Sequence, residues 1–234
     1  MRRFAAVLTV ALALGCGFDS SGGPFIIGGG GNGVTRFRFF HAVADGGNLQ
    51  LLDDGLADLS EIGFASVTPY IQTNGSSVRL TLNSSLSVTP VIDTIVTLPE
   101  SSLVTVVAEG PDSAIALRFV VDGRASPDTG LVKVRVLHEA PTGGSLDVYI
   151  TAPLADLNLA TPTATSITFG TETSYQVLSS GNYQVRLTTA GTKTVVIDSG
   201  SLVLSNGDVR SIVALDATGG GLPLGVIVLL DAGT

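Results

Sequence analysis

The chain has 234 residues, of which only 14% are charged, and its formal net charge is −8. A low charged fraction with a positive mean hydropathy excludes an intrinsically disordered chain. The negative charge argues against nucleic acid as a partner, because an acidic surface repels phosphate backbones. The single cysteine, Cys16, excludes an intrachain disulfide, so each folded part must depend on its own hydrophobic core.

The first 15 residues have the pattern of a bacterial signal peptide. Two arginines precede an uncharged apolar run, 4–14, which is well short of the ~20 residues that span a bilayer. The run ends at Gly15-Cys16, which resembles the lipobox of bacterial lipoproteins. The resemblance implies lipidation of Cys16 and a membrane anchor in the cell envelope. Glycine at position 17, where inner-membrane lipoproteins of enteric bacteria carry aspartate, favours the outer membrane or cell surface.

Two alternatives remain open for this segment. The commonest lipobox has leucine three residues before the cysteine, where this chain has Ala13. Ala11-Leu12-Ala13 matches the A-x-A site of ordinary signal peptidase, and cleavage there would leave a soluble protein. In a third interpretation, Cys16 is simply a small buried hydrophobic residue.

Residues 16–33 are rich in glycine and serine and are predicted to form a flexible, lipidated tether. Within them, 28–33 satisfies G-x-G-x-x-G, the dinucleotide-binding pattern. That pattern binds pyrophosphate only when a helix follows, whereas polar and apolar residues alternate from Val34 as in a strand. We therefore reject a nucleotide site and expect no cofactor.

An internal repeat occupies the rest of the chain. VTRFRFFHAVADGGNLQLL (34–52) aligns with VKVRVLHEAPTGGSLDVYI (132–150), which pairs His41 with His138 and Arg38 with Arg135. Both copies end on an apolar strand and an aspartate, Asp122 and Asp231. The repeat predicts two modules, 34–124 and 131–234, separated by a turn-rich linker.

Each module has six or seven short β-branched runs separated by turn residues, and no segment has a clear helical period. Strands at this spacing predict an all-β fold of two tandem immunoglobulin-like antiparallel β-sandwiches. Asn206-Gly207, which lies between two apolar runs, predicts a β-hairpin because Asn-Gly adopts the positive φ of a type I′ turn.

The second copy resembles a bacterial domain-of-unknown-function family. The resemblance lies in residues 131–215, which include VKVRVLHEAPTGGSLDVYI and TSYQVLSSGNYQVRLTT. Modules of that family have a strand ending in His-Ala-Ser-Pro and continue into Val-Asp-Val-Tyr. Here Glu139-Ala140-Pro141 replaces Ala-Ser-Pro, and the first copy lacks the proline altogether. The resemblance implies tandem β-sandwich modules on envelope lipoproteins and no established activity.

The two histidines, His41 and His138, lie at repeat-equivalent strand ends. Their parity with the apolar set places both rings inward, where an imidazole most often hydrogen-bonds the loop above it. A ligand-binding role for His138 is a weaker alternative. No G-x-S-x-G motif occurs, so we predict no catalytic residues and no enzyme.

Asp147 and Tyr149 alternate with Leu146 and Val148, so they are expected on an exposed face and are candidate ligand-binding residues. The three tyrosines at 70, 175 and 183 are expected to pack at edges or corners. No zinc spacing or calcium-loop motif occurs, so no metal site is predicted, although Asp45-Gly46-Gly47-Asn48 has a composition that could hold calcium weakly.

Together these observations predict a non-enzymatic envelope lipoprotein whose modules serve as structural or interaction domains. Its expected partners are the membrane, through Cys16, and an envelope protein or polysaccharide. The alternative function is that of a polysaccharide- or peptide-binding surface protein, using the loops near 138–145 or a sheet edge.

Overall fold

The computed structural model describes residues 34–56, 59–73 and 75–232. The predicted signal peptide (1–15), Cys16 and the tether (16–33) lie outside the described residues. In the part of the chain that is described, no helix is long and apolar enough to cross a membrane. The prediction of an all-β fold is confirmed, because the regular structure of the described residues consists of strands and two single-turn 3-10 segments.

Module 1 begins with a strand that contains His41 and ends with a strand that contains Asp122. Its elements are β1 Arg36–His41, β2 Leu49–Asp53, β3 Ile71–Gln72, β4 Ser77–Ser84, β5 Ile92–Thr97, β6 Leu103–Glu109, η1 Asp112–Ala114 and β7 Ala116–Asp122.

Module 2 repeats this plan with additional short strands. Its elements are β8 Leu131–Glu139, β9 Leu146–Thr151, η2 Leu157–Leu159, β10 Ala164–Ile167, β11 Thr171–Glu172, β12 Gln176–Ser179, β13 Gly181–Thr189, β14 Val195–Leu204, β15 Val209–Leu215 and β16 Gly225–Ala232.

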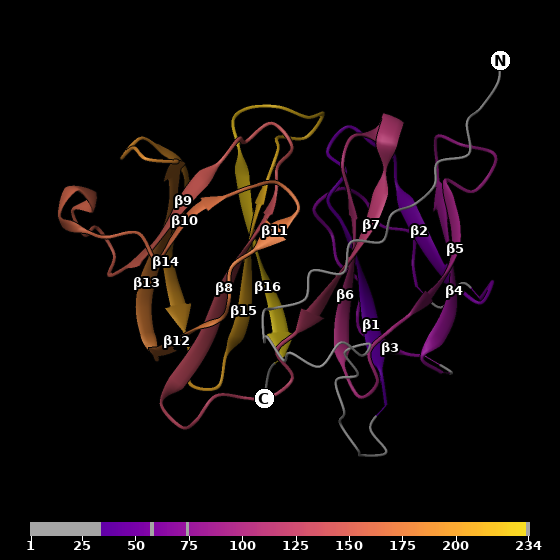
Figure 1. The fold of residues 1–234 in the computed structure, drawn as a ribbon, viewed down its shortest axis with the longest axis horizontal. Coiled ribbons are helices and arrows are strands. Elements are labelled where there is room, and N and C mark those ends of the chain that lie inside the picture. The colour runs from indigo at the N-terminus through magenta and orange to yellow at the C-terminus, as the bar shows by residue number, and fades with distance from the viewer. Residues whose placement is uncertain (1–33, 57–58, 74, 233–234) are drawn as a thin grey trace, which may run out of the picture.

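Each module is a sandwich of two sheets. We call β3-β1-β6-β7 and β11-β8-β15-β16 the seam sheets, because they face each other, and β12 belongs to the second of them through its pairing with β8. The outer sheets are β2-β4-β5 and β10-β9-β13-β14. Figure 1 shows the four sheets side by side, with the seam sheets in the middle and one outer sheet at each end. The molecule is therefore a stack of four β-layers rather than two separate modules.

The strand pairing differs from the sequence expectation in two respects. The sandwiches are not wholly antiparallel, because β1 runs parallel to β6 and β8 runs parallel to β15. The expected hairpin at Asn206-Gly207 does not form, since β14 pairs with β13 while β15 pairs with β8 and β16. Gly207 does have the positive φ of a turn, but the turn carries the chain from the outer sheet to the seam sheet.

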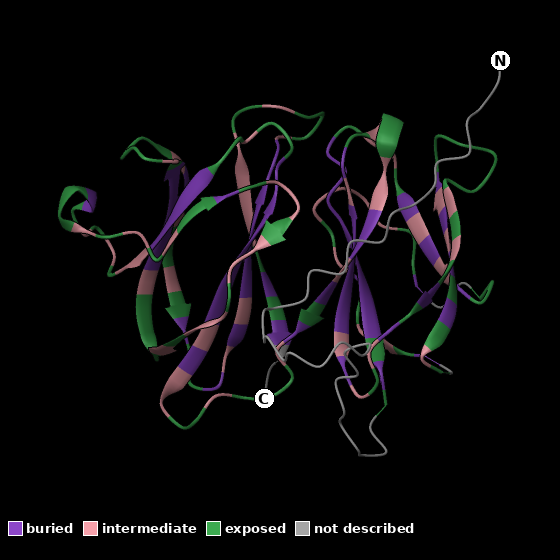
Figure 2. Cartoon of the chain, in the orientation of Figure 1, coloured by how far each residue is buried: buried purple, intermediate pink, exposed green. Residues whose placement is uncertain are grey.

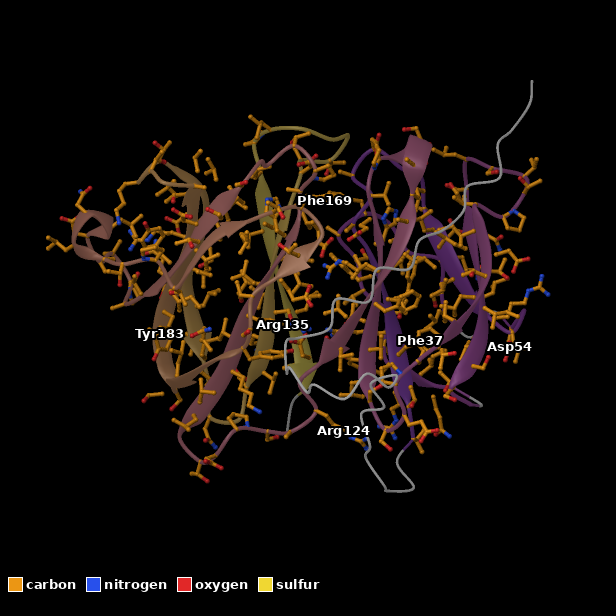
Figure 3. All side chains as sticks on the ribbon, in the orientation of Figure 1. Phe37, Asp54, Arg124, Arg135, Phe169 and Tyr183 are labelled. Atoms are coloured by element: carbon orange, nitrogen blue, oxygen red, sulfur yellow. The ribbon has the colours of Figure 1, made fainter. Side chains whose placement is uncertain are left out.

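Alternating side chains fill the core of each sandwich. Phe37 and Phe39 point into module 1, and Val134 and Val136 occupy the matching positions in module 2. Figure 2 shows that buried residues also run along the seam sheets, and Figure 3 labels Phe37 within module 1 and Arg135 on the seam side of module 2. The opposite faces of these seam strands form the contact between the modules.

Candidate functional site

The centre of the seam between the modules is apolar. Phe40 and Val107 from module 1 pack against Leu137 and Val213 from module 2 in one buried cluster. These side chains lie on the faces of β1, β6, β8 and β15 that point away from each module's own core. The faces that an isolated sandwich would expose are therefore buried against each other.

Two arginines, one on β1 and one on β8, cross the seam in opposite directions. Arg38 Nη2 donates to Asp231 Oδ1 at 2.7 Å, and Arg135 donates to Asp122. Each arginine also donates to a hydroxyl of its own sheet, Arg38 to Thr105 and Arg135 to Ser211, both at 2.8 Å. All of these side chains are buried, so the charges are desolvated. Removing one member of a buried ion pair is strongly destabilising, because the other charge stays out of water. Alternation predicts an outward direction for Arg135, and that side of the strand faces module 1, not solvent.

Two tyrosines complete this network. The guanidinium of Arg38 lies 4.7 Å from the ring centroid of Tyr70, and that of Arg135 lies 4.6 Å from the ring centroid of Tyr175. Tyr70 donates to Asp122 at 2.6 Å, and Tyr175 donates to Asp231 at 2.7 Å. Burial raises the pKa of both tyrosine hydroxyls well above the ordinary value, so they remain donors.

The other end of the seam contains four charged residues, which we call the quartet: Glu109, Arg118, Glu139 and Glu172. Arg118 donates to all three glutamates, with distances of 2.9 Å to Glu109 and 2.6 Å to Glu172. Burial raises the pKa of Glu139 to about 8, against the opposing effect of Arg118 and with a further rise from Glu109. Glu139 Oε2 accepts from no N–H or O–H donor of the described residues, and the Glu139 carboxyl lies near that of Glu109.

A small cleft caps the same end of the seam. It has a volume of about 130 Å³, and loops of both modules contribute its lining, including Asp45, Pro111, Thr142 and Asp216. Asp216 Oδ1 accepts from the Thr142 hydroxyl at 2.7 Å, which fixes one wall. Gly219 N–H donates to the Ala44 carbonyl at 2.7 Å and joins the loops of the two modules. The loop after His138 therefore contributes to a cleft between modules.

Both histidines occupy equivalent structural positions. His138 Nε2 donates to the Gly144 carbonyl at 2.8 Å, while Nδ1 accepts from Ala140 N–H at 3.3 Å. His41 makes the same pair of bonds with Gly47 and Val43. One nitrogen donates and the other accepts, so each ring is neutral, and burial lowers the pKa of both. The expectation that each imidazole holds the loop above it is confirmed.

Asp147 and Tyr149 do not lie on an exposed face, contrary to the sequence expectation. Asp147 accepts from Ser166 N–H and Gly191 N–H, both at 2.8 Å, and Tyr149 is only 2% exposed. Lys193 covers the Tyr149 ring, with Nζ 4.5 Å from its centroid. Alternation did place both residues on the outer face of β9, but neighbouring loops cover that face.

Within the described ranges, no group of three or more His, Cys, Asp or Glu side chains could hold a metal ion. The candidates at His138, Asp147 and Tyr149 are also not brought together, because His138 points into the core and the other two lie on the outer face of β9. The structure instead assembles charged residues at the seam.

The seam residues were not predicted as a site from the sequence, although a signal was present. Arg38 and Arg135 are repeat-equivalent, and so are Asp122 and Asp231, in a chain with only 14% charged residues. Charged side chains at equivalent positions on two strand faces indicate that each face binds a partner. Nothing in the sequence showed that the partner of each face was the other module.

Solved structures give only remote likenesses. A streptococcal virulence factor that binds α-glucan is 12% identical over 72% of this chain and 88% of that chain, with a TM-score of 0.25. A leucine-rich repeat protein from Bacteroides thetaiotaomicron is 13% identical over 76% and 25% of the two chains, with a TM-score of 0.22. A pneumococcal glycogen-degrading virulence factor is 11% identical over 76% and 20%, with a TM-score of 0.25. TM-scores this low carry no argument about function.

No curated protein matches the chain. A family match does exist, and it differs in extent from the 131–215 stretch that carried the resemblance in the sequence. It spans module 1 and the first two strands of module 2, and it ends at Tyr149. Residues 35–149 of this chain match the family model of a domain of unknown function, DUF4397.

Proposed function

We propose that this protein is a non-enzymatic, lipid-anchored protein of the cell envelope whose two modules act together as one structural or interaction unit. The seam is the observation that carries the proposal. Arg38 on the first strand is bound to Asp231 on the last, and an apolar cluster separates this network from the quartet. Domains joined by a large buried contact do not move independently, so the unit presents its two outer sheets in a fixed relation.

The proposal of a non-enzymatic role is supported by the state of the best candidate catalytic side chains. Both ring nitrogens of His41 and of His138 are engaged with backbone groups of their own loops. A general base needs a free nitrogen within reach of a reacting group. Neither histidine offers one in this arrangement.

The anchor is tested by metabolic labelling of the expressed protein with a palmitate analogue. We expect label on the wild-type protein and on Ser20→Ala, and none on Cys16→Ala. Intact-mass measurement then distinguishes cleavage before Cys16 from cleavage after Ala13. A mature protein that begins at Leu14 and carries no lipid would overturn the anchored part of the proposal.

The role of the fixed unit is tested by cross-linking tagged protein in intact envelopes and identifying the captured partner. Arg135→Ala, which breaks the seam, should reduce capture at least tenfold. Arg79→Ala, which removes an exposed pair with Asp93, should leave capture unchanged. Equal capture by both variants would mean that a single module is sufficient and would contradict the proposal of one unit.

A second candidate function, binding of a peptide or polysaccharide, is favoured by the cleft. Its walls include the carboxylates of Asp45 and Asp216, and its described lining contains no arginine or lysine, so a ligand with an ammonium or hydroxyl group fits its chemistry. The test is a peptide and glycan array with the wild type, Asp45→Asn and the exposed control Asp54→Asn. A hit that Asp45→Asn leaves unchanged would exclude the cleft.

A further inference from the structure

The two faces of the seam carry the same polar groups. Module 1 presents Arg38, Thr105, Asp122 and Tyr70, and module 2 presents Arg135, Ser211, Asp231 and Tyr175. Each arginine binds the aspartate of the opposite face. Because the sets match, a module 1 facing another module 1 could form the same bonds, from Arg38 of one copy to Asp122 of the other. This network alone would not distinguish unlike from like modules.

The quartet breaks that equivalence, as the strand register shows. In module 2, Glu139 pairs with Leu215. In module 1, His41 pairs with Ala108, as His138 pairs with Ala214 in module 2. The next residue on each strand of module 1 then brings Ala42 beside Glu109. Glu139 therefore corresponds to Ala42, and Glu109 corresponds to Leu215.

The other two members of the quartet have counterparts by the same reasoning. Arg118 pairs with Val107 in module 1, and Ile227 pairs with the equivalent Val213 in module 2. Arg118 therefore corresponds to Ile227. Glu172 pairs with Leu137 in module 2, and Val67 pairs with the equivalent Phe40 in module 1. Glu172 therefore corresponds to Val67.

The counterparts are therefore apolar at all four positions, and they lie together in or against the apolar cluster of the seam. The charged set is Glu109, Arg118, Glu139 and Glu172, and the matching set is Leu215, Ile227, Ala42 and Val67. The seam therefore contains two equivalent contacts between the modules: the quartet forms one with charged side chains, and the matching set forms the other with apolar side chains.

The charges are poorly explained as a source of stability. Arg118 and Glu139 are 8% and 0% exposed, and desolvation of such a pair often cancels its attraction. The apolar contact shows that the same backbone geometry closes without charges. Moreover, the quartet sets three carboxyl groups against one guanidinium, and Glu139 lies close enough to Glu109 for the two acids to oppose each other's ionisation.

Like-with-like pairing would leave the quartet unsatisfied. Two copies of module 1 would place Arg118 against Ala42 and Val67, so Arg118 would keep Glu109 of its own module but lose Glu139 and Glu172. Two copies of module 2 would place Glu139 against Ile227, with no arginine of the quartet in reach. A buried charged or polar group that loses its partners is destabilising, and such a mismatch discriminates against a wrong partner.

We infer that the quartet selects the partner of each module: the seam face of module 1 accepts a module 2 and rejects another module 1. The fitting partner is the module 2 of the same chain or that of a second copy. In cis, the pairing closes the monomer. In trans, it would exchange modules between two chains, with residues 123–130 as the connection between β7 and β8.

The test reverses the charges on one face at a time. R118E makes the module 1 half of the quartet wholly acidic, and E139R/E172R makes the module 2 half wholly basic. In the R118E chain alone, acidic side chains then face each other across the seam. In the E139R/E172R chain alone, Arg118 faces two arginines, and Glu109 is the one acid left in the quartet. In a dimer that exchanges modules between the two chains, the acidic module 1 of R118E pairs with the basic module 2 of E139R/E172R. The other seam joins the two unchanged modules and is therefore wild type. The full chain carrying Cys16→Ser is used, so that no lipid complicates the masses.

The two variants are refolded together from denaturant, one of them isotopically labelled, and weighed by native mass spectrometry. We expect a 1:1 heterodimer at least tenfold more abundant than in a mixture of labelled and unlabelled wild type. The triple variant R118E/E139R/E172R, with the reversed pair in cis, should be a monomer. No enrichment of the heterodimer, or a monomeric R118E chain as stable as wild type, would overturn the inference.

A second variant covers the case in which charge reversal prevents folding. E109L/R118I/E139A/E172V gives the quartet the residues of its counterparts. We expect a folded chain at least as stable as wild type, because selection rather than stability is lost. A midpoint of chemical unfolding far below that of wild type would show that the quartet stabilises the seam, and would overturn the inference.

Discussion

Arg38 and Asp231, which are 193 positions apart, form a 2.7 Å ion pair that ties the first strand of the described fold to the last. The pair is buried, and Arg38 Nη1 also donates to the Leu230 carbonyl at 2.7 Å. The repeat-equivalent Arg135 makes the same kinds of contact with Asp122 and the Val121 carbonyl. Removing either arginine therefore takes the close cationic partner from a buried carboxylate, which keeps only hydroxyl donors at short range, and takes the side-chain donor from a backbone carbonyl.

The seam arginines are expected to be essential for stability. Arg38→Ala should lower the free energy of unfolding by about 3 kcal/mol, because the buried Asp231 loses its closest cation, although Tyr175 and Ser211 still donate to it. The matched control is Arg79→Ala, whose pair with Asp93 is exposed to solvent, where screening leaves an ion pair little net effect. Urea unfolding followed by circular dichroism measures both. Similar losses for the two variants would contradict the importance of the seam.

Glu139 should make the stability of the fold depend on pH between pH 4.5 and about 8. The pKa of Glu139 is about 8 in the fold, above its ordinary value of 4.5, because burial disfavours the charged form. Its contribution to stability is therefore complete below pH 4.5 and is lost as the pH rises through 8. Glu139→Gln removes this titration, because the amide stays neutral throughout.

The measurement is urea unfolding of the wild type and Glu139→Gln at pH 5, 7 and 9. The stability difference should change in favour of the variant as the pH rises. Glu61→Gln, at an exposed position, should parallel the wild type at all three values. A pH-independent difference between wild type and Glu139→Gln would mean that Glu139 has the same pKa in the folded and the unfolded chain.

The two histidines are expected to have a structural role. His138→Ala should cost roughly 2–4 kcal/mol, because the Gly144 carbonyl and Ala140 N–H lose their partner and a cavity forms. His41→Ala should cost a similar amount, since it makes equivalent bonds. Zinc or a chelator should shift the melting temperature of neither wild type nor variant. A metal-dependent shift in wild type that is lost in His138→Ala would show a ligand role instead.

The buried histidines should also make the fold less stable in acid. Burial lowers the pKa of His138 below its ordinary value of 6.5, so the neutral ring stabilises the fold fully above pH 6.5. The contribution is lost as the pH falls through the folded pKa. The stability difference between wild type and His138→Ala should therefore shrink as urea unfolding is repeated from pH 7 down to pH 4.

Tyr149 should contribute to folding rather than to binding. Tyr149→Ala should lower the free energy of unfolding by roughly 3 kcal/mol, because the side chain is buried beneath Lys193. Tyr183→Ala should cost less, since that tyrosine is only partly buried and its hydroxyl donates to the Ser179 carbonyl in an exposed hydrogen bond. An unchanged stability of Tyr149→Ala would indicate that Tyr149 is free to contact a ligand after all.

Local sequence patterns were sufficient to predict the all-β class, the two copies and the inward direction of His41 and His138. The all-β class and the direction of the histidines depend on alternation along single strands, which fixes which side chains share a face. The two copies follow from the internal repeat. The repeat also identified Arg38 and Arg135 as equivalent. Alternation could not say what lies opposite the outward face, so it left Arg135 and Tyr149 at an expected surface.

Which surfaces are covered depends on the tertiary structure alone. Asn206-Gly207 has the chemistry of a hairpin turn, yet its flanking strands join different sheets, because strand pairing depends on contacts far apart in the chain. The quartet joins residues from β6, β7, β8 and β11, and no local pattern connects them. Their common environment, and with it the raised pKa of Glu139, exists only once two modules have excluded water between them.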